Sequence, residues 1–151
     1  MSLRNLKHMP QIVAVMTPFP YSIDMDARLT QAMDMMQEHK IRHLPVMEQG
    51  NLVSVLTDRD IKMALDPSIG LPPRDQLTVR NACVIDAYIV NTNAPLDRVL
   101  LEMAERHIGS ALVVKEQKLA GIFTASDACR FLGDLLSAQF PVYTGGGDDA
   151  A

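Results

Sequence analysis

The chain contains one long internal repeat, and this feature limits its possible folds more than any other. When the sequence of 151 residues is shifted by about 67 positions, residues 12–61 align without a gap with residues 79–128. A repeat of this length is one supersecondary unit that cannot bury its hydrophobic face alone, so two similar units are expected to pack on each other. The identical pairs are Tyr21 and Tyr88, Ala27 and Ala94, Leu29 and Leu96, Met36 and Met103, Glu38 and Glu105, Ile41 and Ile108, Val46 and Val113, Leu52 and Leu119, Thr57 and Thr124, and Asp60 and Asp127.

Both copies predict the same order of elements: strand, helix, hairpin and helix. The opening strands are expected at 12–16 and 88–90. The next helices have apolar residues at the i, i+3, i+4 and i+7 positions of one face. Short apolar runs separated by a polar turn then predict hairpins at 44–56 and 111–123, and the closing helices are expected at 58–65 and 125–136. The apolar helical faces are Leu29, Ala32, Met33 and Met36 in the first copy, and Leu96, Val99, Leu100 and Met103 in the second.

These elements divide the chain into two repeats, 12–66 and 79–136, with a linker between them and a tail after them. The linker, 67–78, contains clustered prolines and a glycine, which continue neither a helix nor a strand. The tail, 137–151, ends in glycines, aspartates and alanines and is expected to be partly disordered. Two sheets packed face to face would bury the apolar surface that each repeat leaves open.

Composition and charge exclude several classes of protein. A content of 48% hydrophobic and 21% charged residues is that of an ordinary folded domain, and the net charge of −4 lacks the basic surface of a nucleic-acid-binding protein. No apolar run approaches the ~20 residues that cross a bilayer, and the run at 12–16 is too short for a secretory signal. Cys83 and Cys129 are too few for a disulfide framework. We therefore expect a cytoplasmic protein with no membrane or nucleic-acid partner.

The most informative local motif lies between each hairpin and its closing helix. It reads TDRD at 57–60 and TASD at 124–127. One interpretation is structural: Thr57 and Thr124 cap the helices, and Asp60 and Asp127 lie favourably in their first turns. The other is functional, because free amide N–H groups at a helix start bind phosphate and a nearby carboxylate accepts both hydroxyls of a ribose. Both interpretations remain open at this stage.

Together these motifs resemble the tandem cystathionine-β-synthase (CBS) domain family, also called the Bateman module. The resemblance depends on VMTP at 15–18, IRHLPV at 41–46, LVSVLTDRDI at 52–61 and LAGIFTASD at 119–127, and it covers about residues 12–136. It implies an α+β fold of two βαββα repeats packed sheet to sheet with pseudo-twofold symmetry. It also implies a regulatory module that binds AMP, ADP, ATP, S-adenosylmethionine or NAD(H) between the repeats. A homodimer, an effector protein and no catalytic cofactor are further implications.

The resemblance implies two clefts, each formed by the Thr-x-x-Asp motif of one repeat and the opening segment of the other. Asp60 and Asp127 would hold the ribose, while Arg42 and His43 would cover phosphates in the first cleft only. We therefore expect the first cleft to prefer a phosphorylated nucleotide and the second to bind more weakly or to prefer a less charged adenosine. The expected residues are Arg42, His43, Val55, Thr57, Arg59, Asp60, Cys83 and Tyr88 in the first cleft, and Thr17, Pro20, Tyr21, Gly109, Ser110, Ile122, Thr124 and Asp127 in the second.

Ser54 stands where the family usually has glycine, which Gly121 supplies in the second repeat. Its side chain is therefore expected to crowd the backbone approach in the first cleft.

Two alternatives to a ligand sensor differ in how well the sequence supports them. An enzyme is not expected, because the chain has no Gly-rich phosphate loop and no Gly-x-Ser-x-Gly motif. No metal site is expected either, since the four histidines have no regular ligand spacing with each other or with the cysteines. A ligand-free structural or dimerisation module remains open, because Thr-x-x-Asp motifs also cap helices without binding anything.

Overall fold

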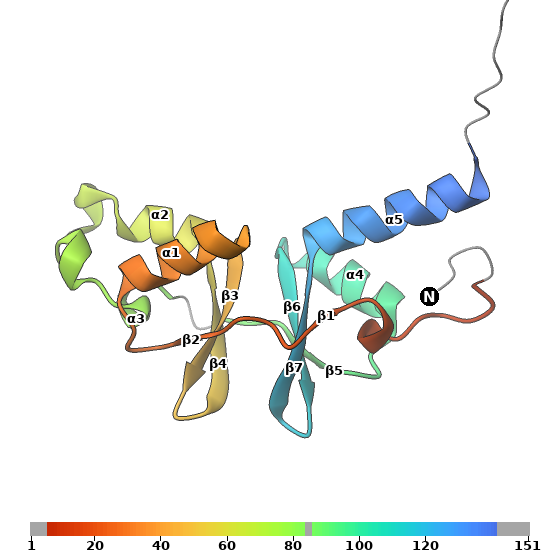
Figure 1. The fold of residues 1–151 in the computed structure, drawn as a ribbon, viewed down its shortest axis with the longest axis horizontal. Coiled ribbons are helices and arrows are strands. Elements are labelled where there is room, and N and C mark those ends of the chain that lie inside the picture. The colour runs from red at the N-terminus through yellow and green to blue at the C-terminus, as the bar shows by residue number, and fades with distance from the viewer. Residues whose placement is uncertain (1–5, 84–85, 142–151) are drawn as a thin grey trace, which may run out of the picture.

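Two small β-sheets lie side by side at the centre of the molecule, and the helices lie on their two outer flanks (Figure 1). The structure is a computed structural model and describes residues 6–83 and 86–141. The first sheet has the order β2-β3-β4 and the second the order β1-β7-β6-β5. The strands are β1 (Thr17–Pro18), β2 (Ile23–Asp24), β3 (His43–Glu48), β4 (Asn51–Thr57), β5 (Ile89–Asn91), β6 (Ser110–Lys115) and β7 (Lys118–Thr124). The helices are α1 (Leu29–His39), α2 (Asp58–Ala64), α3 (Val79–Ala82), α4 (Leu96–Glu105) and α5 (Ala125–Gln139), with 3₁₀ turns η2 (Ile12–Ala14), η3 (Pro67–Ile69) and η4 (Arg74–Gln76).

The two halves repeat each other down to the register of their strands. In the first half β2 pairs in parallel with β3 across helix α1, and in the second half β5 pairs in parallel with β6 across helix α4. The two strands of each hairpin, β3 with β4 and β6 with β7, pair antiparallel. A register shift falls between Val46 and Met47 in one hairpin and at the equivalent place, between Val113 and Val114, in the other. Both hairpins turn through two residues with positive φ, which fits the right-handed twist of the strands. The expected pair of repeats in an α+β fold is confirmed.

The predicted amphipathic helices are also present. In α1 the residues Leu29, Ala32 and Met36 are buried, and in α4 the equivalent Leu96, Val99 and Met103 are buried. Helix α5 ends at Gln139, beyond the expected end at 136. Pro95 is the N-cap of α4. Residues 142–151, which include most of the tail expected to be disordered, lie outside the described residues.

The opening strand predicted at 12–16 is wrong. Residues Ile12–Ala14 form the 3₁₀ turn η2. The strand of the first repeat that is equivalent to β5 of the second is β2, which begins later, at Ile23. The equivalent of η2 in the second repeat is the short helix α3, so both repeats begin with a helical turn whose first residue, Ile12 or Val79, is buried. A short apolar run has the same composition in a buried turn as in a buried strand, and periodicity does not distinguish them.

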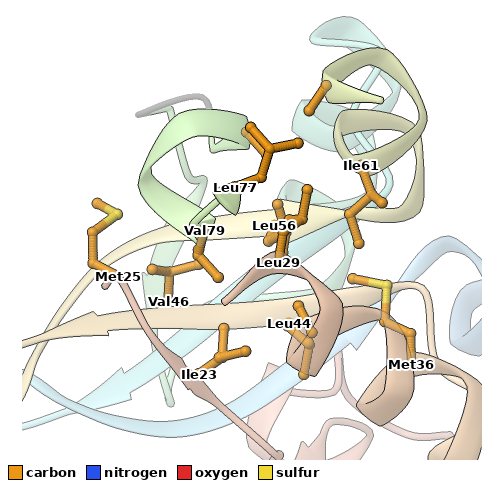
Figure 2. Close-up of a cluster of buried hydrophobic side chains, with 13 residues drawn as sticks. Ile23, Met25, Leu29, Met36, Leu44, Val46, Leu56, Ile61, Leu77 and Val79 are labelled. Atoms are coloured by element: carbon orange, nitrogen blue, oxygen red, sulfur yellow. The ribbon is translucent and has the colours of Figure 1, made fainter. Parts of the chain in front are cut away.

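The helical turn that leads into each repeat packs in the core of the other repeat. The amide of Ile12 donates to Ala94 O at 2.8 Å, and the amide of Val79 donates to Ala27 O at 2.9 Å. Ile12 is fully buried in the core of the second repeat, while Leu77 and Val79 belong to the core of the first (Figure 2). Strand β1 continues this exchange by pairing with β7. The two cores therefore depend on each other.

A glycine is needed at position 121, because the segment from Met16 to Pro18 crosses β7 there. A Cβ at this position would collide with the Met16 side chain and lie 3.0 Å from the backbone oxygen of Thr17. We expect Gly121→Ala to lower the free energy of unfolding by about 1–2 kcal/mol, because the crossing backbone must shift. Gly133→Ala is the matched control: this glycine lies in α5 with no atom near its Cβ position, so alanine should stabilise by about 1 kcal/mol. Urea unfolding of the two variants measures both effects, and equal stability would contradict the account of the crossing.

Among the residues that the structure describes, no helix combines the length and the apolar character that crossing a bilayer requires.

Candidate functional site

Both Thr-x-x-Asp motifs form reciprocal capping boxes at the starts of α2 and α5. The amide of Thr57 donates to Asp60 Oδ2 at 2.8 Å, and the amide of Asp60 donates to Thr57 Oγ1 at 3.1 Å. The same pair of bonds joins Thr124 and Asp127, at 2.9 and 3.2 Å. The structural interpretation of the motif is confirmed.

Capping uses only one oxygen of each carboxylate. Within the described part of the chain, Asp60 Oδ1 has no hydrogen-bond donor, and Asp127 Oδ1 has only the Arg130 guanidinium, with Nη1 at 3.4 Å. Both aspartates are partly exposed. Each carboxylate therefore retains acceptor capacity for a ligand, and the capping role does not exclude a binding role.

Two clefts lie between the repeats, one beside each of these aspartates. The Asp60 cleft has a volume of about 300 Å³ and the Asp127 cleft about 530 Å³, within the range of small-molecule sites. The Asp60 cleft is lined by His43, Val55, Thr57, Arg59, Asp60, Asp86, Tyr88, His107, Ile108, Gly109 and Ser110. The Asp127 cleft is lined by Thr17, Pro20, Tyr21, Lys40, Ile41, Arg42, His43, Ile122, Thr124, Ser126, Asp127 and Arg130.

Most of the residues expected for each cleft do come together. In the Asp60 cleft the expected residues that line the wall are His43, Val55, Thr57, Arg59, Asp60 and Tyr88. In the Asp127 cleft they are Thr17, Pro20, Tyr21, Ile122, Thr124 and Asp127. The opening segment of one repeat therefore faces the Thr-x-x-Asp motif of the other.

Arg42, Gly109 and Ser110 lie in the opposite clefts from those expected. Arg42 lines the Asp127 cleft, and Gly109 and Ser110 line the Asp60 cleft. The backbone of each segment stays with its own motif, because Arg42 O accepts from the Asp58 amide and Gly109 O from the Ala125 amide. The exposed Arg42 nevertheless lines the Asp127 cleft between the two repeats. The reason given above for a phosphate preference in the first cleft is therefore lost.

Cys83 lines neither cleft, and Ser54 does not crowd the Asp60 cleft. The Cys83 thiol lies 3.0 Å from Ser54 Oγ, behind the strand that carries Val55. This contact is the equivalent of Met16 against Gly121, so a smaller residue in the crossing segment makes room for the serine. Burial raises the pKa of the Cys83 thiol.

A tyrosine side chain is held in place at the wall of each cleft. The Tyr21 ring stacks on His39 with centroids 3.7 Å apart, and the Arg106 guanidinium lies over the Tyr88 ring at 5.1 Å. His39 and Arg106 are equivalent positions at the ends of α1 and α4. Burial raises the pKa of the Tyr88 hydroxyl.

His43 belongs to both clefts. Its imidazole packs on the backbone of Gly109, where a Cβ would lie 2.8 Å from Nε2. Burial lowers the pKa of His43, and the Arg42 charge adds to this, whereas Asp60 and Asp127 on either side oppose it. The side chain is therefore a neutral donor and acceptor at pH 7, placed between the two sites.

The lowered pKa of His43 predicts a pH dependence of stability. The unfolded chain binds a proton near pH 6.5 and the folded chain only at lower pH, so the free energy of unfolding falls as pH decreases through this window. The limit for one proton is about 1.4 kcal/mol per pH unit. Urea unfolding between pH 7.5 and 5.5 should show a smaller fall for His43→Gln than for the wild type. His8→Gln, which removes an exposed imidazole, should keep the wild-type profile, and an equal change in both variants would contradict the assignment.

Sequence reasoning missed seven lining residues: Asp86, His107 and Ile108 of the Asp60 cleft, and Lys40, Ile41, Ser126 and Arg130 of the Asp127 cleft. Lys40 and His107 are equivalent left-handed residues, each with a φ of 53°, and each lines a cleft. Their signal was the repeat alignment itself, since each lies four residues after the last apolar residue of a predicted helical face, Met36 or Met103. Arg130 lies three residues after Asp127 on the same helical face, a spacing that the sequence already contained.

No three histidine, cysteine, aspartate or glutamate side chains within residues 6–83 and 86–141 are grouped so as to hold a metal ion.

The fold and the paired clefts define a tandem-repeat module with two small-molecule clefts between its halves. Comparison with known proteins identifies the family: the model of the CBS domain matches residues 12–67 and 79–134, so the chain belongs to the CBS domain family. Hypoxic response protein 1 of Mycobacterium tuberculosis is 34% identical over 113 residues, which cover 74% of this chain and 78% of that protein.

Solved structures of CBS domain pairs share the fold. The CBS domain pair of protein MJ0100, in complex with 5′-methylthioadenosine and S-adenosyl-L-methionine, has a TM-score of 0.72 at 22% identity, over 83% of this chain and 98% of that one. CBSX2 in complex with AMP has a TM-score of 0.70 at 21% identity, over 83% of this chain and 97% of that one. The expected tandem CBS module is confirmed.

Proposed function

We propose that the protein is a regulatory sensor that binds adenosine-containing ligands in the clefts between its CBS repeats. The observation that carries this proposal is the pair of capping carboxylates, Asp60 and Asp127, each in a cleft wall with an oxygen left to accept ribose hydroxyls. Beside each carboxylate an apolar side chain, Val55 or Ile122, offers a surface for a base. The role is regulatory rather than catalytic.

The ligands of the neighbouring structures support the same ligand class. 5′-Methylthioadenosine, S-adenosyl-L-methionine and AMP, which those proteins bind, all contain adenosine and differ in what the ribose 5′ position carries. The adenosine part therefore fits the features that both clefts of this chain share, a carboxylate and an apolar wall residue. The 5′ substituent would then lie among the residues that differ between the clefts.

Ligand binding would act by changing how the repeats sit against each other. Each cleft has walls from both repeats, so a bound ligand favours the arrangement in which it contacts both. It shifts this equilibrium only by its difference in affinity for the two arrangements. The altered surface, or altered self-association as a homodimer, would be read by a partner protein.

A thermal-shift panel of AMP, ADP, ATP, S-adenosylmethionine and NADH tests the proposal. A ligand present at about 100 times its dissociation constant stabilises the folded state by about 2.7 kcal/mol, which raises the melting temperature by several degrees. Guanosine and GMP at the same concentrations are the controls for the base. Failure of every adenosine compound to raise the melting temperature at millimolar concentration would contradict the sensor proposal. It would favour the ligand-free dimerisation module, in which Thr57 and Thr124 only cap their helices.

A further inference from the structure

The two clefts differ in charge at positions that the repeat makes equivalent. The Asp127 cleft contains three cationic side chains, Lys40, Arg42 and Arg130, against one carboxylate. Their equivalents in the other half are His107, Gly109 and Met63, so the Asp60 cleft has none of these charges. Among the described residues, the cationic side chain in the wall of that cleft is Arg59, next to Asp60 in the sequence, and Asp86 is paired with Arg106 at 3.2 Å. The Asp60 cleft is close to balanced, and the Asp127 cleft has an excess of positive charge.

The cations of the Asp127 cleft are available to a ligand. Within the described residues, Lys40 and Arg42 have no carboxylate within 4.0 Å. Arg130 has only a long contact with Asp127, and its side chain is 71% exposed. Like-charged side chains that share one hollow repel each other unless an anion lies between them. The arrangement is therefore suited to an anionic ligand group.

The difference in charge coincides with a steric difference at position 109. The His43 imidazole occupies the space beside Gly109, where any side chain would begin 2.8 Å from Nε2. Position 109 therefore cannot carry an equivalent of Arg42 while His43 lies in this position. The His43 imidazole thus lies in the Asp60 cleft where the equivalent of the Arg42 side chain would begin, whereas Arg42 itself lines the Asp127 cleft.

We propose that the two clefts bind different kinds of adenosine compound. The Asp127 cleft binds a phosphorylated adenosine, with its phosphate among Lys40, Arg42 and Arg130, and the Asp60 cleft binds an adenosine compound without a phosphate. Guanidinium groups form charge-assisted hydrogen bonds to phosphate oxygens, often two at once. This inference rests on the proposed function, and it reverses the preference that the sequence predicted. Because Arg42 comes from the first repeat and Arg130 from the second, one phosphate would join the two repeats directly.

Calorimetric titration of the whole protein with AMP and with adenosine tests this division. The wild type is expected to bind AMP at least tenfold more tightly than adenosine at its stronger site. Arg42→Gln and Arg130→Met, the latter copying the equivalent Met63, should each weaken AMP binding by about tenfold and change adenosine binding by less than twofold. Arg98→Gln is the matched control, since it removes an exposed arginine of α4 outside both clefts and should change neither affinity.

The reciprocal substitution Met63→Arg adds a cation to the Asp60 cleft at the position equivalent to Arg130. Met63 is 57% exposed, so the fold should tolerate the change. This variant is expected to bind AMP at the weaker site several-fold more tightly than the wild type.

Two different failures are distinguishable. Equal binding of AMP and adenosine by the wild type would overturn the division while leaving the sensor proposal intact. So would loss of the AMP preference in Arg59→Gln and not in Arg42→Gln, because the phosphate would then lie in the Asp60 cleft. Absence of binding by both compounds would overturn the division and the proposed function together.

Discussion

Replacing Ile12 with alanine is expected to lower the free energy of unfolding by about 2–4 kcal/mol, although Ile12 precedes the whole first sheet in the sequence. Its side chain is fully buried among Leu96, Val99 and Phe123 of the second repeat. Removing most of it leaves a cavity in a core that has few other residues to fill the space. The loss should therefore be measured as destabilisation of the second repeat and not of the first.

Urea unfolding followed by circular dichroism measures the total effect, and hydrogen exchange locates it. Val13→Ala is the matched control, because Val13 follows Ile12 in the same 3₁₀ turn but is 46% exposed, and its loss should cost less than about 0.5 kcal/mol. Faster exchange should appear at amides of β6 and β7 in Ile12→Ala. A change confined to β3 and β4, or equal stability of the two variants, would contradict the exchange of leading segments between the repeats.

The exchange explains which parts of the fold the sequence predicted and which it did not. The helices and hairpins follow from periodicity and turn residues, which are local, so α1, α4 and both hairpins lie where the apolar patterns place them. The role of Ile12 is not local, because its partners, from Leu96 to Phe123, lie 84 to 111 residues further along the chain. The repeat alignment pairs Ile12 with Val79 and so shows that the two positions are equivalent. The sequence alone does not show that each of them packs in the core of the other repeat.

The same limit explains why Arg42 was expected in the other cleft. The sequence places Arg42 beside the motif of its own repeat, and the backbone does lie there, since Arg42 O accepts from the first amide of α2. A long side chain reaches far from its backbone, and Arg42 lines the Asp127 cleft. The residue types predicted which kinds of side chain line the clefts. Only the fold shows which charged side chains line the same cleft.

Asp127→Asn is expected to weaken AMP binding at the stronger site by about 100-fold while lowering the free energy of unfolding by less than about 1 kcal/mol. An asparagine keeps one oxygen that accepts from the Thr124 amide, so most of the capping box survives. It loses the charge and the second acceptor, and each ribose hydroxyl hydrogen-bonded to a charged group contributes about 1.5–3 kcal/mol. The proposed binding role and the observed capping role of this carboxylate are therefore separable by one substitution.

Titration calorimetry with AMP and urea unfolding of the same variant give the two quantities. Asp134→Asn controls for the loss of one exposed carboxylate of α5 outside both clefts, and it should change neither quantity appreciably. Asp60→Asn should leave the stronger AMP site intact and remove the weaker adenosine site, because the two carboxylates serve different clefts. If Asp127→Asn instead lost stability by more than about 2 kcal/mol with unchanged AMP affinity, Asp127 would be a helix cap alone, and the ribose contact would have to be assigned to another group.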